Sequence, residues 1–403
     1  MRSDAKPIRI TGHLPGLDGV RGLAILMVLA VHFVGDATPR AWGERLAVKL
    51  GGYGVLGVDL FFVLSGFLIT GLLLDSKGGL HYFRNFYARR TLRIFPLYYA
   101  VLALLFLVLP LLATLPPPLE DARSHQVWLW TYTANFFIAA KASWALTYVS
   151  HFWSLAIEEH FYLVWPLVVF SFRRETLERI CLGAIGVALA LRIALSLAGV
   201  SELSISVLTP CRVDTLCVGA LLATVARREG GPGLLVRRSG PAALAVAAAT
   251  LAVSGWCAAM RTGLAVLHPI RGTLFAIFFG ALTLMSVQDA EQSLVARAFQ
   301  SSWLRTFGKY SYGLYVYHGV LSWHMQELRV QDRLEALLAS NSLAIAAQAV
   351  LGVGLSLVVS ALSYELFEKR FLALKRLFEP KRAAAAAPSR PPESSAGEAG
   401  TAA

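Results

Sequence analysis

The sequence predicts an all-α membrane protein, a polytopic bundle of about ten transmembrane helices. Hydrophobic residues make up 56% of the 403 residues and charged residues only 15%, whereas soluble domains carry about 25% charged residues. The apolar residues gather in runs of roughly 17 to 25, which is the length that a helix needs to cross a bilayer. Lys and Arg concentrate between these runs, as they do in the loops of membrane proteins.

Ten such runs follow one another, and the sequence contains no internal repeat. The ninth run is short and rich in tyrosine, so we expect it to pack inside the bundle. We expect one membrane domain over 16–375, an N-terminal segment over 1–15, and a basic, then disordered tail over 376–403. The runs cover residues 17–35, 53–74, 93–115, 152–172, 179–199, 207–226, 241–259, 266–287, 310–326 and 343–366.

The basic residues predict that both termini lie in the cytoplasm. If the N-terminus is inside, the inner segments hold 23 Lys and Arg and the outer segments hold 8, and cytoplasmic loops carry such an excess. This pattern accounts for the net charge of +12. No long basic run interleaved with aromatic residues points to nucleic acid. We therefore expect a multi-pass protein of the plasma (inner) membrane, in contact with lipids.

Two further features have a structural interpretation. The longest predicted outer loop, roughly 116–150, contains Trp128, Trp130, Tyr132 and Trp144, which is typical of interfacial anchoring or of a partly ordered lid. The cysteines form no CxxC pair and no grouping with histidine, so we expect packing residues and no metal site. These cysteines are Cys181, Cys211, Cys217 and Cys257.

The first run carries two ionisable residues, Arg21 and His32. Arginine facing lipid costs several kcal/mol, so such groups usually face a bundle interior or a cavity. Eleven residues at about 1.5 Å each place His32 roughly 16 Å deeper than Arg21, about half of the ~30 Å hydrocarbon core. A base in mid-membrane and a cation near one surface suggest a site for an anion. The alternative is that His32 only hydrogen-bonds between helices.

More ionisable residues are predicted in the outer half of the membrane, at the depth of His32. Asp59 lies in the second run and Glu158 in the fourth, and both runs begin on the outer side. Arg212 and Asp214 open the sixth run, which also begins there. The five side chains can therefore occupy one layer. Alternatively, Asp59 and Glu158 pair with Arg212 only to neutralise buried charge.

Arg90 and Arg93 stand where the cytoplasm meets the third run. Residues three apart share a helix face, and two guanidinium forks can clamp phosphate groups. The alternative is a plain positive flank of a membrane span. In the later runs, His318 and Glu365 can act as internal fasteners between helices.

Together these segments resemble the acyltransferase family 3 membrane enzymes. That family carries an R-x10-H motif in the first helix and an RxxR motif before the third, which here are Arg21 with His32 and Arg90 with Arg93. His160 stands where family members often have glutamine. The resemblance extends over about residues 15 to 375. Its other segments are GVDLFFVLSGFLIT from Gly57, HFWSLAIEEHFYLVWP at 151–166, RVDTLCVGALLA at 212–223 and FGKYSYGLYVYHG at 307–319.

The resemblance implies transfer of an acyl group, commonly acetyl, from acyl-coenzyme A to a hydroxyl of a glycan, a lipid-linked sugar or a small natural product. It implies a donor substrate and no permanently bound cofactor. Coenzyme A is polyanionic and cytoplasmic, which matches Arg21, Arg90 and Arg93 at the inner face. Transfer from a thioester to an alcohol needs a base near the hydroxyl and stabilisation of an oxyanion.

His32 is the expected base, and it either deprotonates the acceptor directly or first carries the acyl group. Asp59 or Glu158 would orient its ring. Arg212 or Tyr315 would assist the acceptor or the oxyanion. The expected substrate-binding residues are Arg21, Arg90, Arg93, Arg212, Asp214, Tyr315 and His318.

The competing functional class is a transporter or flippase of a polar or anionic small molecule. Such a protein would also place charges in mid-membrane. It would carry inverted repeats and Gly- or Pro-broken helices in matching halves, and the sequence contains neither pattern. The enzyme is therefore the preferred hypothesis.

Overall fold

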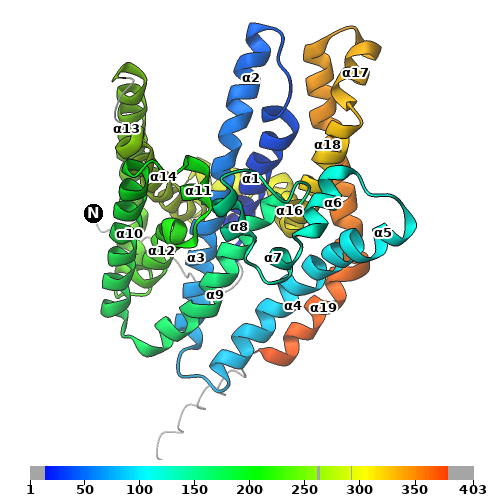
Figure 1. Ribbon diagram of the computed structural model, residues 1–403. Coiled ribbons are helices and arrows are strands. Elements are labelled where there is room, and N and C mark those ends of the chain that lie inside the picture. The colour runs from blue at the N-terminus through cyan, green and yellow to red at the C-terminus, as the bar shows by residue number, and fades with distance from the viewer. Residues whose placement is uncertain (1–13, 261–263, 292, 380–403) are drawn as a thin grey trace, which may run out of the picture.

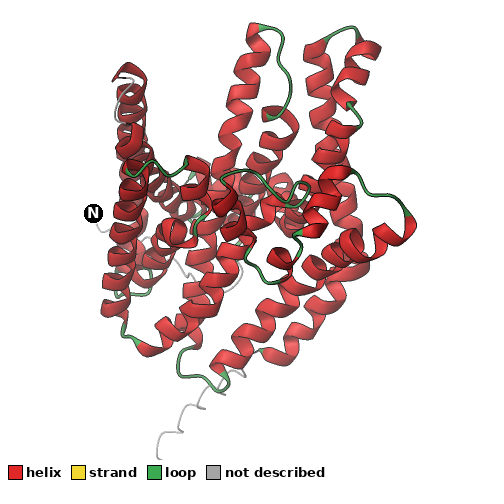
Figure 2. Ribbon diagram, viewed as in Figure 1, coloured by secondary structure: helices red, strands yellow, loops and turns green. Residues whose placement is uncertain are grey.

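The computed structural model describes residues 14–260, 264–291 and 293–379. Over these residues the chain is helical and contains no strand (Figure 2). The all-α prediction is confirmed. Most of the predicted N-terminal segment 1–15 and of the tail 376–403 lies outside the described residues.

All ten predicted spans fall on helices, and seven of the described helical segments are long and apolar enough to cross a membrane. The other three predicted spans correspond to α9, α12 and α16. The long helices are α1 (Pro15–Ala30), α3 (Leu56–Ser76), α4 (Tyr82–Ala103), α9 (Trp153–Ser171), α10 (Arg174–Leu197), α12 (Thr209–Val225), α13 (Gly231–Met260), α14 (Leu264–Ser286), α16 (Ser302–Glu327) and α18 (Asn341–Ser363).

Shorter elements join these helices. π-helical turns follow α1, α4 and α18, and they are η1 (Val31–Gly35), η3 (Leu104–Val108) and η5 (Tyr364–Glu368). The short α-helices are α2 (Trp42–Gly52), α5 (Leu109–Leu112), α6 (Pro117–Ser124), α7 (Val127–Trp130), α8 (Ala134–Lys141), α11 (Glu202–Val207), α15 (Leu294–Phe299), α17 (Val330–Leu338) and α19 (Lys369–Ala373). The 3₁₀ turns are η2 (Tyr53–Val55), η4 (Ser150–Phe152) and η6 (Leu374–Phe378).

Glycines allow the central helices to approach closely. A Cβ atom at Gly66 of α3 would overlap the carbonyl oxygen of Leu216 in α12, and one at Gly308 of α16 would overlap the carbonyl oxygen of Asp18 in α1. Small residues at helix interfaces are a usual way to pack helices in lipid, where no hydrophobic effect drives helices together. These contacts fix α1 against α16 and α3 against α12, which carry most of the candidate site residues.

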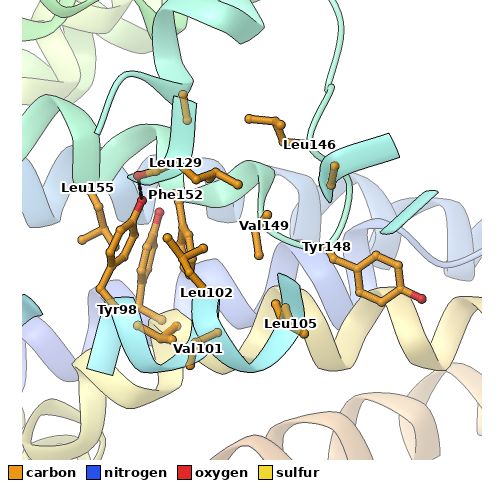
Figure 3. Packing of buried hydrophobic residues seen from close by; sticks show 14 of the residues in the cluster. Tyr98, Val101, Leu102, Leu105, Leu129, Leu146, Tyr148, Val149, Phe152 and Leu155 are labelled. Atoms are coloured by element: carbon orange, nitrogen blue, oxygen red, sulfur yellow. Dashed lines mark hydrogen bonds between the residues drawn. The ribbon is translucent and has the colours of Figure 1, made fainter. Parts of the chain in front are cut away.

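The long loop over 116–150 is ordered and packs on α4. Leu129, Leu146 and Val149 of this loop are buried in one apolar cluster with Val101, Leu102 and Tyr98 of α4 (Figure 3). The Tyr98 hydroxyl of α4 donates a hydrogen bond to the Leu129 carbonyl oxygen at 2.8 Å. The ring of Tyr132 stacks on Tyr98, with 4.4 Å between the ring centroids. The loop is therefore ordered and belongs to the folded domain.

After α18 the chain turns through η5 into α19 and η6. These elements pack against α4, and Figure 1 shows α19 running beside it. The guanidinium carbon of Arg84 in α4 lies 5.4 Å from the ring centroid of Phe378 in η6. The end of the described chain is thus part of the folded domain.

Candidate active site

Two neighbouring cavities lie among α1, α3, α4 and α9. The small cavity has a volume of about 110 Å³, and Arg93, Glu158 and Tyr315 line it. The large cavity has a volume of about 510 Å³ and is lined by residues of α1, α3 and α4. Arg21 and Arg90 line both cavities, so these two side chains form a shared wall. The structure therefore brings together the three arginines of the predicted donor site.

These arginines are only partly neutralised. Arg21 Nη1 lies 2.7 Å from Asp18 Oδ1. The guanidinium of Arg90 lies over the Tyr162 ring, 5.5 Å from its centroid. Within the described part of the chain, neither Arg90 nor Arg93 forms an ion pair with a carboxylate. An anionic ligand would supply the missing charge.

Glu158 lies with the arginines of α4 rather than beside His32. Glu158 lines the small cavity together with Ser65, Tyr162, Arg90 and Arg93. The Ser65 and Tyr162 hydroxyl oxygens are 2.5 Å apart. The predicted outer layer is therefore not one cluster, because the long arginine side chains of α4 reach into the interior near α9.

Tyr315 connects the small cavity to a group of histidines. The Ser154 and Tyr315 hydroxyl oxygens are 2.5 Å apart, and the Tyr315 hydroxyl donates to the carbonyl oxygen of His151. The centroid of the Tyr315 ring lies 5.5 Å from those of His151 and His318. Both hydroxyl groups line the cavity.

His318 is fully buried between two other imidazoles. Its ring centroid lies 4.9 Å from that of His32 and 4.7 Å from that of His151. His318 Nδ1 donates to the Tyr315 carbonyl oxygen at 2.7 Å, which leaves the lone pair on Nε2. That atom is buried and has no hydrogen-bond partner among the described residues. The predicted residue His318 is thus in ring contact with the predicted base.

His151, which follows the long loop 116–150, is held against α16. His151 Nε2 donates to the Val316 carbonyl oxygen of α16 at 3.3 Å, and the nearby Tyr148 hydroxyl donates to Glu327. Burial, together with that hydrogen bond, raises the pKa of Tyr148. The hydroxyl therefore stays protonated at neutral pH and remains a donor that ties the loop 116–150 to α16.

His32 lies in the π-helical turn η1. The Asp36 N–H donates to the Val31 carbonyl oxygen at 2.9 Å, and Asp36 Oδ2 lies 3.1 Å from His32 Nδ1. An Nδ1–H donated to this carboxylate leaves the lone pair on Nε2. Single π turns in α-helices are frequent at functional sites. The carboxylate at His32 is therefore Asp36, and not Asp59 or Glu158 as the sequence suggested.

The remaining predicted residues form a separate charge cluster. Arg212 makes an ion pair with Asp59, as the charge-neutralising alternative predicted. Asp214 is fully buried and accepts a hydrogen bond from Arg192 Nη2 at 2.7 Å. The same nitrogen donates to the Thr273 hydroxyl at 2.6 Å. None of these residues lines either of the two cavities, so the structure does not bring Arg212 and Asp214 to the predicted donor site.

Sequence reasoning did not select Asp36 or Arg192 as partners. The available signals were the position of Asp36 four residues after His32 and the occurrence of an arginine inside the apolar run 179–199. Ser154 shares a helix face with Glu158 in the fourth run, four residues away. Ser65 gave no signal, because single serines are common in membrane helices.

The described residues contain no group of three or more His, Cys, Asp or Glu side chains placed to hold a metal ion. Cys181, Cys211 and Cys217 are buried and free, in agreement with the packing role expected for them. The polar groups of the cavities and of the neighbouring histidine group are arginines, hydroxyls, one glutamate and imidazoles.

The sequence profile of a known family, described as an acyltransferase domain, matches residues 14–365. The chain belongs to this acyltransferase family. The match includes both predicted motifs, Arg21 with His32 and Arg90 with Arg93. It ends within η5, so α19 and η6 lie beyond the matched part of the acyltransferase domain.

Curated relatives of this acyltransferase domain include bacterial O-acetyltransferases. The O-acetyltransferase OatA of Staphylococcus aureus is 28% identical over 327 residues, which cover 76% of this chain and 50% of OatA. The peptidoglycan O-acetyltransferase OatA of Listeria monocytogenes is 28% identical over 323 residues, which cover 76% of this chain and 49% of that protein. The putative peptidoglycan O-acetyltransferase YrhL of Bacillus subtilis is 35% identical over 164 residues, which cover 38% of this chain and 23% of YrhL.

The chain thus spans about half the length of the OatA proteins that it matches. No solved structure matches it.

Proposed function

We propose that this chain is an integral-membrane O-acyltransferase that moves an acyl group, acetyl in the first instance, from acyl-coenzyme A to a hydroxyl of a glycan or related acceptor. Membership of the acyltransferase family and the relatives named as peptidoglycan O-acetyltransferases support this function. The observation that carries the proposal is the small cavity, which is lined by Arg21, Arg90 and Arg93 and also by Tyr315, the neighbour of the histidine group.

The donor would bind from the cytoplasm, with its phosphates at the arginines. Arg21 and Arg90 line both cavities, so a ligand that fills the large cavity with its nucleotide part can extend its thioester into the small one. Arginine suits this position because its planar fork binds phosphate in a bidentate way and stays charged near a low-dielectric region.

This geometry requires the protein to lie in the plasma membrane with both termini in the cytoplasm. The excess of basic residues in alternate segments supports that orientation. Cysteine labelling with a membrane-impermeant reagent checks it. A cysteine at Ala37 should react from outside and one at Gly230 should not, and the reverse pattern would overturn both the orientation and the side of donor entry.

His32 would act as the base, with Asp36 as its positioning residue. The imidazole Nε2 takes the proton of the acceptor hydroxyl while the hydroxyl oxygen attacks the thioester carbonyl carbon. The tetrahedral intermediate then expels the coenzyme A sulfur, which receives the proton. The Tyr315 hydroxyl lines the cavity and would donate to the oxyanion after releasing the His151 carbonyl oxygen. Asp36 stabilises the imidazolium while it carries the proton.

Release of coenzyme A by the purified full-length protein, measured with a panel of hydroxylated acceptors, tests the proposal. His32→Ala should reduce transfer by ~10²- to 10⁴-fold, which is the usual loss when a general base is removed. Asp36→Asn should reduce kcat roughly tenfold without changing the donor KM, since it removes one charge-assisted hydrogen bond. Both variants should keep the wild-type thermal unfolding temperature. Transfer within threefold of wild type in His32→Ala would refute the assignment.

A further inference from the structure

One face of α16 carries a row of polar side chains that runs from the small cavity past His32. Ser311 and Tyr315 line the cavity. His318 follows three residues after Tyr315, and its ring centroid lies 4.9 Å from that of His32. Ser322 lies one turn further along α16, and residues three and four apart share a helix face. His318 is therefore the point at which this row meets the proposed base.

The hydrogen bonds of His318 fix its tautomer. Its Nδ1 atom lies 2.7 Å from the carbonyl oxygen of Tyr315 and 3.1 Å from that of Leu314. A carbonyl oxygen only accepts, so Nδ1 carries the proton and Nε2 carries the lone pair. The ring is fully buried, and Nε2 has no hydrogen-bond partner among the described residues. A buried acceptor without a donor is unfavourable, so a neighbouring group is expected to donate to it during the reaction.

The first neighbouring imidazole, His151, cannot supply that donor. Its Nε2 donates to the Val316 carbonyl oxygen at 3.3 Å, and a neutral ring then has only a lone pair on Nδ1. A Cβ atom at Gly319 would overlap the His151 ring, so the backbone of α16 packs directly on this ring and keeps it in place. His151 therefore has no second N–H for His318.

The second neighbouring imidazole, His32, lacks a donor only while it is neutral. Its Nδ1 lies 3.1 Å from Asp36 Oδ2, so the neutral ring carries the proton on Nδ1 and the lone pair on Nε2. Neither His32 nor His318 can then donate to the other through Nε2. A proton taken up by His32 at Nε2 changes this, because it creates an N–H in a ring that contacts a buried, unused acceptor.

We propose that His318 is a positioning residue for His32, and that its Nε2 accepts a hydrogen bond from the His32 imidazolium. This inference rests on the proposed function, because it concerns the same base. The χ2 torsion of histidine has a broad distribution, so a rotation of the His32 ring turns its Nε2–H toward His318. The proton comes from the acceptor hydroxyl and stays on His32 until the coenzyme A sulfur takes it. No covalent bond forms at His318.

Two substitutions separate the roles of the two nitrogens of His318. His318→Asn keeps an amide N–H near the position of Nδ1 and has no atom at Nε2, whereas His318→Gln places an amide oxygen near Nε2 and loses the Nδ1 donor. The matched control is Ser322→Ala, which removes another buried, unpartnered polar atom of the same row. For each full-length protein in detergent, kcat, both KM values and the thermal unfolding temperature are measured beside wild type.

His318→Asn should lower kcat roughly 10- to 150-fold, the expected loss of one hydrogen bond to a charged group. Both KM values and the unfolding temperature should stay near wild type. His318→Gln should keep kcat within threefold of wild type and unfold at a lower temperature, because the bonds from Nδ1 are lost. Ser322→Ala should keep kcat within twofold. A purely structural role of His318 would give the reverse order of activities, with His318→Gln less active than His318→Asn.

A kcat of His318→Asn within threefold of wild type would overturn the inference, and so would an equal loss in His318→Gln. An equal loss in Ser322→Ala would also overturn it, since the hydroxyl would then be the partner of Nε2. If neither His318 variant folds, the residue is structural and the inference fails.

The proposed function has separate outcomes in the same assay. It fails if wild type releases no coenzyme A or if His32→Ala retains transfer. If His32→Ala is inactive and both His318 variants are active, His32 remains the base and His318 does not act through it.

Discussion

Two sets of arginines inside the helical bundle differ in how their charge is balanced. Arg192 and Arg212 each make an ion pair with an aspartate, and both side chains are largely buried. Arg90 and Arg93 lie along cavities and have no such pair among the described residues. The charge of the first set is balanced by protein carboxylates. The arginines of the second set have no such ion pair, so an anionic ligand can bind to them. We therefore expect pairing, more than position in the membrane, to distinguish a structural arginine from a ligand-binding one.

The difference also explains why the structure places Arg90 along the cavities but not Arg212, although the sequence suggested a binding role for both. Arg212 and Arg90 both lie near the start of a predicted membrane span. Only the packing of α12 against α3 decides that Arg212 meets Asp59. Predictions that break or restore these pairs therefore test the comparison directly.

The largest effect is expected for the buried pair of Arg192 and Asp214. Asp214→Ala leaves the Arg192 guanidinium buried without its partner, and breaking such a pair costs about 3–5 kcal/mol of stability. Thermal unfolding in detergent should show a large drop. Arg93→Ala, the matched change in the unpaired set, should leave the unfolding temperature unchanged. Equal stability of Asp214→Ala and wild type would remove the distinction between the two sets.

Substitutions of the unpaired arginines should change the KM for the acyl donor and leave the stability of the protein unchanged. Arg90→Ala or Arg93→Ala should raise the KM for acyl-coenzyme A roughly 10- to 150-fold, which corresponds to ~1.5–3 kcal/mol for a lost charge-assisted contact. The acceptor KM should stay near wild type. Arg305→Ala, which changes an exposed arginine at the start of α16, provides the control. If the donor KM does not change, these arginines are only the positive flank of a span.

The smallest effect is expected for the pair of Arg212 and Asp59. A double-mutant cycle with Arg212→Ala and Asp59→Ala should give a coupling energy of about 0.5–3 kcal/mol in unfolding experiments. The double variant should be less destabilised than the sum of the single ones, and donor and acceptor KM should change little. An increase in the acceptor KM in Arg212→Ala alone would instead restore the substrate-binding role that the sequence suggested.

Much of the fold follows from the sequence because apolar runs of membrane length leave few alternatives. Each predicted span falls on a helix, including the run 207–226 that opens with Arg212 and Asp214. The grouping of Arg21, Arg90 and Arg93 was also predictable, since the predicted orientation of two spans places them at the same surface. The orientation of a span sets the depth of each of its residues in the membrane, and depth alone was enough to group these three arginines.

The sequence could not give the partner of each side chain, because that depends on the rotation of helices about their axes. Asp59 and Glu158 were expected at His32, yet Asp59 pairs with Arg212 and Glu158 lines the small cavity with Ser65. Asp36 reaches His32 through a local π turn, which no periodicity of apolar residues indicates.

The glycine contact between α1 and α16 has a consequence for the imidazoles at the other end of the same helices. Gly308 lies against Asp18 near Arg21, and His318 follows ten residues later on α16, roughly 15 Å along its axis. A methyl group at Gly308 would force the two backbones apart, and the shift would be carried along both helices toward His32. A displacement of about 1 Å can cost a hundredfold in rate. The absence of a side chain at Gly308 therefore helps to keep the His32 and His318 rings at their spacing.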